Sequence, residues 1–179
     1  MFPKEERILA WQKIPESSRI IFFASIIIII FLTPNLAEGY ESTWDEVNIN
    51  TNNNYNAAVI DSNGDAWVFG DNGVIIHGEK LTNWSIVNSP TVEDILTADS
   101  NENLVVAAGK NGVVIYKEIQ SNEWINIDID NQTRINSVSI NNVDEIVIVT
   151  DLGDIQIFKD NEWLQINSLT SEKLFDITF

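Results

Sequence analysis

Short apolar runs alternate with polar turns along most of the chain. From residue 57 onward, runs of five to seven residues rich in Val and Ile are separated by segments of Asn, Asp and Gly. Runs of this length are too short for typical helices, and their β-branched content favours strands. The pattern therefore predicts an all-β architecture with a tight turn after most strands.

The order strand, glycine turn, strand, polar turn and tryptophan occurs three times. Four tryptophans recur at intervals of 40, 40 and 39 residues: Trp44, Trp84, Trp124 and Trp163. The turn glycines recur 39 and 41 residues apart: Gly73, Gly112 and Gly153. A repeat of roughly 40–45 residues with four short strands is typical of a β-propeller blade. Another β solenoid or a β-sandwich is the alternative fold.

Aligning the copies predicts the strands of each blade. First strands are expected at 57–61, 94–98, 136–140 and, cut short, 175–179. Second strands are expected at 66–70, 104–109 and 145–150. Third strands are expected at 74–77, 113–117 and 154–158, and a fourth strand follows each tryptophan. The second strands are apolar almost without alternation, which indicates that neighbouring blades cover both of their faces.

The chain divides into a leader, residues 1–39, and a partial propeller, residues 40–179. The blades span about 56–88, 93–128 and 134–167, and a further blade starts at 174. The lone strand around Trp44 resembles a fourth strand, which in a closed ring completes the last blade. Closed propellers have roughly 4–8 blades. We therefore expect this chain to be a truncated piece of a longer one, or to self-associate.

The leader has the order of charges found in targeting segments. Four cations precede thirteen apolar residues at 20–32, and Thr33 and Pro34 end that run. A spanning helix needs about 20 apolar residues, whereas a signal-peptide core has roughly 7–15. Small residues at Ala37 and Gly39 would permit cleavage before Tyr40. The leader is either a cleaved signal peptide or an uncleaved anchor, and both predict an extracytoplasmic propeller, secreted or membrane-anchored.

The strong negative charge narrows the class of partner. The chain has 27 acidic residues against 10 Lys and Arg, a formal net charge of −17. Such a balance opposes binding to nucleic acid and to anionic lipid. We expect no nucleic-acid partner and membrane contact only through the leader. The charge serves solubility, or it attracts a basic partner or divalent cations.

Few residues offer catalytic chemistry. The absence of Cys excludes disulfides, thiolate metal sites and a Cys nucleophile. His77 is the only histidine, which excludes multi-histidine metal sites, and no nucleophile-elbow motif is present. We therefore predict no catalytic, cofactor-binding or metal-binding residue, and a protein that is not an enzyme.

One turn has the residue types of a calcium loop. Oxygen-bearing side chains alternate at Asp61, Asn63 and Asp65. The second copy offers Asp99, Asn101 and Asn103, and the third offers Asn141, Val143 and Glu145, which breaks the pattern. Asp, Asn and Gly are also the residues of ordinary turns, and a plain turn is the favoured interpretation. N-glycosylation motifs begin at Asn83 and Asn131.

The glycines and tryptophans of the repeat resemble those of photosystem II assembly-factor-like propellers and, more loosely, BNR (sialidase-like) propellers. The residues that match are Gly64, Trp67, Gly70, Gly73 and Trp84 in the first copy, Gly109, Gly112 and Trp124 in the second, and Gly153 and Trp163 in the third. The core is also similar to that of exported sensor propellers of two-component regulators. The resemblance covers residues 44–179 and implies a propeller fold.

Functional residues of these families are absent. Sialidases hold a carboxylate with three arginines, and Arg134 is the one arginine after residue 39; the Asp-box motif is also missing. The basic patch of the assembly factors has no counterpart here. The resulting hypothesis is a non-catalytic exported scaffold or assembly module that binds a protein or a glycan. The alternatives are the sensor half of a signalling receptor and a glycan-active enzyme with paired carboxylates.

Overall fold

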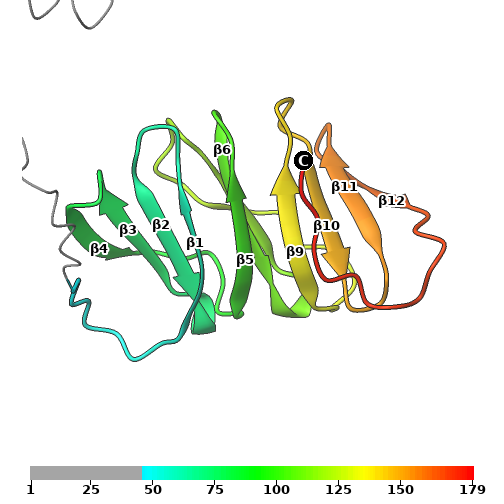
Figure 1. Ribbon diagram of the computed structural model, residues 1–179, viewed down its shortest axis with the longest axis horizontal. Coiled ribbons are helices and arrows are strands. Elements are labelled where there is room, and N and C mark those ends of the chain that lie inside the picture. Colours follow the sequence, from blue (N-terminus) through cyan, green and yellow to red (C-terminus); the bar gives the residue numbers. More distant parts are fainter. Residues whose placement is uncertain (1–45) are drawn as a thin grey trace, which may run out of the picture. The chain divides into compact units, whose positions relative to one another are not determined.

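Three four-stranded antiparallel sheets make up the part of the chain that the computed structural model describes, residues 46–179 (Figure 1). The first sheet contains β1 (Tyr55–Ile60), β2 (Ala66–Gly70), β3 (Ile75–Glu79) and β4 (Asn83–Val87). The second contains β5 (Ile95–Ser100), β6 (Leu104–Gly109), β7 (Val114–Glu118) and β8 (Ile125–Asn126). The third contains β9 (Ile135–Ile140), β10 (Ile146–Thr150), β11 (Ile155–Lys159) and β12 (Glu162–Ile166). Within each sheet, the strands are paired in chain order.

The sheets confirm the predicted all-β fold with propeller-type blades of four antiparallel strands. The predicted bounds of β2 and β6 agree with the structure at both ends, and most others differ by one or two residues. The fourth strands β4 and β12 begin one residue before their tryptophan, and β8 has only two residues. The predicted leader and the Trp44 strand lie outside the described residues. Across residues 46–179 there is no helix long and apolar enough to cross a membrane.

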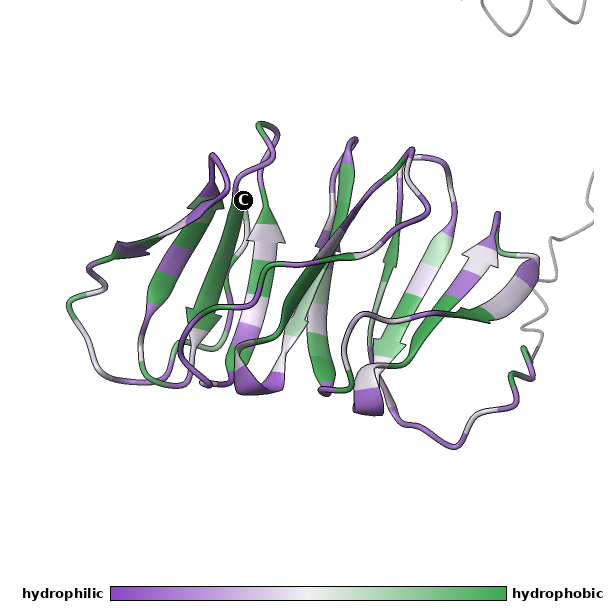
Figure 2. Ribbon diagram, turned by 180° about the vertical axis from the view of Figure 1, so that it is seen from behind, coloured by the Kyte–Doolittle hydropathy of each residue, from purple (hydrophilic) through white to green (hydrophobic). Residues whose placement is uncertain are grey.

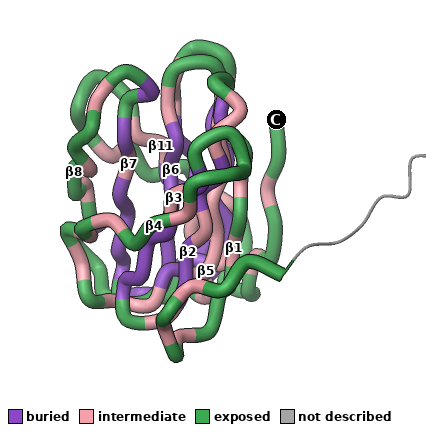
Figure 3. Tube along the Cα trace, turned by 90° about the vertical axis from the view of Figure 1, so that its left-hand side faces the viewer, coloured by how far each residue is buried: buried purple, intermediate pink, exposed green. Residues whose placement is uncertain are grey.

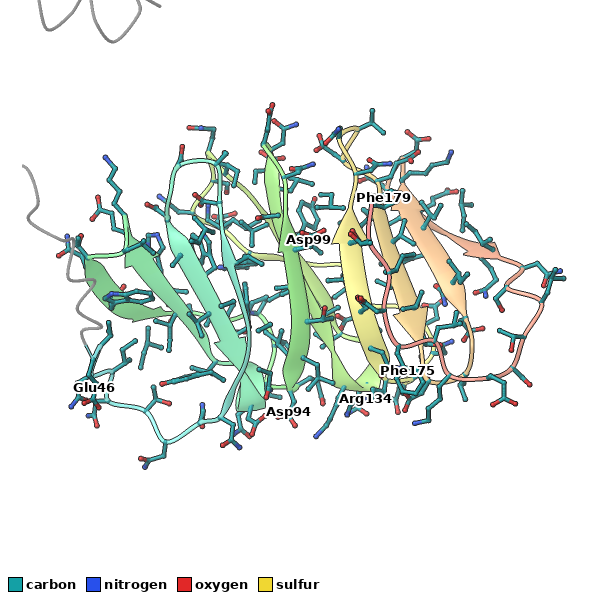
Figure 4. All side chains as sticks on the ribbon, viewed as in Figure 1. Glu46, Asp94, Asp99, Arg134, Phe175 and Phe179 are labelled. Atoms are coloured by element: carbon teal, nitrogen blue, oxygen red, sulfur yellow. The ribbon has the colours of Figure 1, made fainter. Side chains whose placement is uncertain are left out.

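The predicted strand at 175–179 is wrong. This segment runs alongside β9 in space (Figure 1), but it forms no strand. Leu174 donates its backbone N–H to Thr150 O, and Ser137 Oγ donates to Asp176 Oδ1 at 2.8 Å. No second strand pairs with the segment within the described residues, and a strand is defined by that ladder of bonds. Phe175 and Phe179 (Figure 4) are therefore 75% and 66% exposed.

The hydrophobic cores lie between the sheets. Apolar residues follow the strands and polar residues gather in the turns (Figure 2). The first core joins Phe69 and Ile75 of the first sheet to Val105 and Ile115 of the second. The second core joins Val106 of the second sheet to Ile148 and other residues of the third. Buried positions run along the middle strands (Figure 3), so the prediction that β2, β6 and β10 are covered on both faces is confirmed.

Side chains also connect the first strands β1, β5 and β9 from one repeat to the next. Ser100 Oγ donates to Ile60 O at 3.1 Å, and Ser139 Oγ donates to Asp99 Oδ2 at 3.0 Å. Each pair is 40 residues apart, the length of one repeat. These bonds align each first strand with the first strand of the next blade. The interface between the first and second sheets is therefore built from the same repeat positions as the interface between the second and third.

Candidate functional site

Two cavities lie in equivalent places, one between the first and second sheets and one between the second and third. Strand pairing shows that Gly78, Lys117 and Phe158 have the same position in the third strands of the three blades. They pair with the equivalent second-strand residues Ala66, Val105 and Ile146. Lys117 extends into the first cavity and Phe158 into the second, at the same position of their blades. The first cavity measures about 510 Å³ and the second about 460 Å³. We call them the first and the second inter-blade cavity.

Asp61 caps the hairpin turn beside the first inter-blade cavity. Its Oδ1 accepts the backbone N–H groups of Asn63 and Asp65, and its Oδ2 accepts Trp67 Nε1–H at 2.9 Å. Asn101 and Asn141 cap the equivalent turns in the same way. Asp61, Asn101 and Asn141 thus act as ordinary turn residues whose side chains satisfy backbone groups. Asp99, also in the predicted calcium loops, instead lies in β5 and accepts bonds from Ile140 N–H and Ser139 Oγ of the next blade. Within residues 46–179, no cluster of three or more acidic or histidine side chains could hold a metal ion.

His77 is held in place by its neighbours. Its Nε2 lies 2.9 Å from Asp65 Oδ2, and its ring stacks on Trp67 with 4.2 Å between centroids. The backbone N–H of Lys80, and then the His77 bond, lower the pKa of Asp65 below its usual value. These contacts give His77 a structural role in the wall of the first inter-blade cavity.

Lys117 is a buried lysine that the sequence reading missed. The residue is 5% exposed, and its Nζ donates to the carbonyls of Glu118 at 2.9 Å and Ile119 at 3.3 Å. Nζ also lies 5.2 Å from the centre of the Trp67 ring. Burial lowers the pKa of Lys117, and the charges of Asp61 and Asp65 oppose that shift. The sequence signal that could have indicated this burial is a lysine within an apolar strand, at the repeat position that Gly78 and Phe158 have in the other blades.

Replacing Lys117 with methionine is expected to change the free energy of unfolding by less than about 1.5 kcal/mol, because removing a buried charge offsets the loss of its two hydrogen bonds to carbonyl groups. Methionine fills the same space without a buried charge. Because burial lowers the pKa below 10.5, wild-type stability should rise as the pH increases from that lowered pKa toward 10.5. Urea titrations at several pH values measure both effects. A variant that is clearly less stable, with an unchanged pH dependence, would contradict the prediction.

Trp124 closes the first inter-blade cavity. Its ring meets Trp67 and Phe69 edge to face, with centroids 5.4 and 5.6 Å apart. Trp163 has the corresponding place at the second interface, where its Nε1 donates to Ile127 O at 2.7 Å. Trp84 instead lies on Gly78 and belongs to neither core among the described residues. The predicted equivalence of the three tryptophans therefore holds for Trp124 and Trp163 but not for Trp84.

The second inter-blade cavity has an apolar floor and an acidic rim. Its floor is formed by Leu104, Tyr116, Ile146 and Phe158. Its rim carries Glu118, Asp144, Glu145 and Asp160, with Lys159 as the cation among its lining residues. Lys159 Nζ lies 3.8 Å from Glu145, and Asp144 accepts bonds from the amides of Asn101 and Asn103. Glu118 and Asp160 form no side-chain hydrogen bond or ion pair with the described part of the chain, so they are available to a ligand.

No protein-family model matches the chain, and no curated protein matches its sequence. A search of solved structures finds YCF48, a photosystem II assembly factor, in a structure described as "YCF48 bound to D1 peptide". The two share a TM-score of 0.56 and 12% sequence identity over 66% of this chain. The match spans 42% of the length of the YCF48 chain. It confirms, at the level of the fold, the resemblance to photosystem II assembly-factor-like β-propellers.

Proposed function

We propose that this chain is a non-catalytic propeller module that binds a basic segment of a partner protein, and that the second inter-blade cavity receives a lysine or arginine side chain of that segment. The observation that carries the proposal is the combination of an apolar floor with an acidic rim. Lysine and arginine have the complementary form, an apolar stem that ends in a positive charge.

The individual contacts fit such a side chain. The rings of Tyr116 and Phe158 lie in the floor, where they can pack against an aliphatic stem and attract a cation. Glu118 and Asp160 stand on the rim, one from the second sheet and one from the third. A guanidinium group placed between two carboxylates forms charge-assisted hydrogen bonds, which are stronger than neutral ones.

Two further observations support a protein partner. The structurally similar YCF48 was solved with a D1 peptide, so a propeller of this kind can accommodate a protein segment. The net charge of −17 also favours a partner of opposite charge, since complementary charge accelerates association.

Export is part of the proposal. Its support is the leader, in which basic residues precede thirteen apolar residues at 20–32. A reporter enzyme that is active only outside the cytoplasm, fused after Phe179, tests this part. Reporter activity that depends on residues 1–39 would support export, and equal activity without them would contradict it.

The binding proposal is tested by replacing Glu118 with glutamine and Asp160 with asparagine in one variant. The probe is a fluorescently labelled peptide of twelve residues with alternating arginine and alanine, and anisotropy measures its binding. We expect the double variant to bind roughly tenfold more weakly, because about 1.4 kcal/mol of charge-assisted bonding corresponds to a factor of ten. Added salt should weaken binding to the wild type, since salt screens surface charge.

A matched control separates the cavity from overall charge. The variant Asp130→Asn/Glu172→Gln also removes two negative charges, but these lie outside the cavity, in the segments beside Gly112 and Gly153. It should bind the peptide as the wild type does. Equal weakening in both double variants, or no binding of the peptide by the wild type, would refute a specific site at the second inter-blade cavity.

A further inference from the structure

The first inter-blade cavity differs in chemistry from the second, although the two occupy equivalent places. Where the second has Leu104, Tyr116 and Phe158, the first has Asp65, His77 and Lys117. A volume of about 510 Å³ lies within the range of roughly 300–1,000 Å³ that is typical of small-molecule sites. The polar lining of the first cavity is therefore suited to a different ligand.

The charged groups of this cavity are already satisfied by the protein itself. Both oxygens of Asp61 accept bonds from the hairpin and from Trp67. Those of Asp65 accept bonds from Lys80 N–H and from His77. Two of the three ammonium protons of Lys117 point to backbone carbonyls. Lys117 offsets one of the two carboxylate charges, so the net charge of the cavity is negative and disfavours an anion. Both carboxylates are occupied by hydrogen bonds within the protein, so neither is free to hold a cation.

Three amides provide the unused hydrogen-bonding capacity. Asn63, Asn88 and Asn122 line the cavity, and all three side chains are exposed. Their amide groups form no hydrogen bond with other parts of residues 46–179, although the backbone of Asn63 belongs to the Asp61 turn. An amide can donate and accept at the same time, so it can pair with a hydroxyl group in either role. Trp124 adds a partly exposed apolar wall beside these amides.

We infer that the first inter-blade cavity binds a neutral saccharide, a single sugar ring or a short chain of rings. Hydroxyl groups would pair with the amides of Asn63, Asn88 and Asn122, and an apolar ring face would pack against Trp124. Lys117 would contribute its third N–H. This site is separate from the one proposed for a basic protein segment, and the two can be occupied independently.

The test uses the full chain on an array of immobilised glycans that includes neutral, sialylated and sulfated chains. The wild type should bind at least one neutral chain, with a Kd in about the millimolar range for the corresponding free sugar measured by saturation-transfer NMR. Asn88→Ala and Asn122→Ala should each weaken that binding about tenfold. Both side chains are exposed, so the melting temperatures of these variants should match that of the wild type.

Asn142→Ala is the matched control, because this amide is also exposed but lies beside the second interface. It should bind the same glycan as the wild type does. The inference is overturned if no neutral glycan binds, or if the Asn88 and Asn122 variants bind as well as Asn142→Ala. Binding confined to sialylated or sulfated glycans would also overturn it, since the lysine would then select an anion.

Discussion

Replacing Trp124 with alanine is expected to lower the free energy of unfolding by about 3–5 kcal/mol. The ring packs edge to face on Trp67 and Phe69, and it joins the core between the first and second sheets. Its removal leaves a cavity that two separate sheets would have to shift to fill. Urea denaturation followed by far-ultraviolet circular dichroism measures the loss without relying on tryptophan fluorescence.

Trp84→Ala is the comparison for Trp124→Ala, because Trp84 has the same position in the preceding repeat. Trp84 lies against Gly78 of its own sheet and joins neither inter-blade core of the described residues. We expect this change to cost clearly less than Trp124→Ala, about 1–2 kcal/mol, as is typical of a partly exposed side chain. If both variants lost the same free energy, the rings would be stabilised by their own sheets and not by the neighbouring blade.

Replacing Gly73 with alanine is expected to cost about 2–5 kcal/mol. The residue has φ of +69°, and a left-handed conformation costs an L-residue about 1–2 kcal/mol. An added Cβ would also lie 2.2 Å from Thr91 O, on the segment that leads to the second sheet. Relieving such a contact requires a backbone shift, which costs about 1–3 kcal/mol. The midpoint of urea unfolding measures the sum.

Gly64→Ala measures the left-handed strain alone, so comparing it with Gly73→Ala gives the cost of the contact with Thr91 O. Gly64 has φ of +82°, and nothing lies within 4 Å of an added Cβ. This variant should lose only the left-handed strain, about 1–2 kcal/mol. A Gly73→Ala protein as stable as Gly64→Ala would show that the segment around Thr91 yields freely to the added methyl group.

Local features of the fold could be predicted from the sequence, whereas contacts between blades could not. The runs AWVFG and LVVAAG identify β2 and β6, because a short apolar run that ends at a glycine marks where the strand begins and ends. Lys117 was missed because its burial depends on Trp67, 50 residues earlier in the chain. The segment 175–179 has the sequence pattern of a strand, but pairing requires a partner strand.

The lining of the two inter-blade cavities could not be predicted from the sequence, because it also depends on contacts between blades. Hairpin turns and strand periodicity are local, so the positions of Asp61 and Gly73 followed from residues beside them. The chemistry of a cavity depends on which residues of two different blades face each other. Asp65 and Lys117 are 52 residues apart, and nothing in the sequence near either one indicates that they line one space.

Because the cores lie between the sheets, the free energy of folding belongs to pairs of neighbouring blades and cannot be divided among single ones. The described part of the chain therefore behaves as a linear array with nearest-neighbour coupling. A defect at Trp124 weakens the coupling of the first blade to the second and leaves the core of the second and third blades intact. Local opening is then expected to spread along the array one blade at a time, starting from the weakened interface.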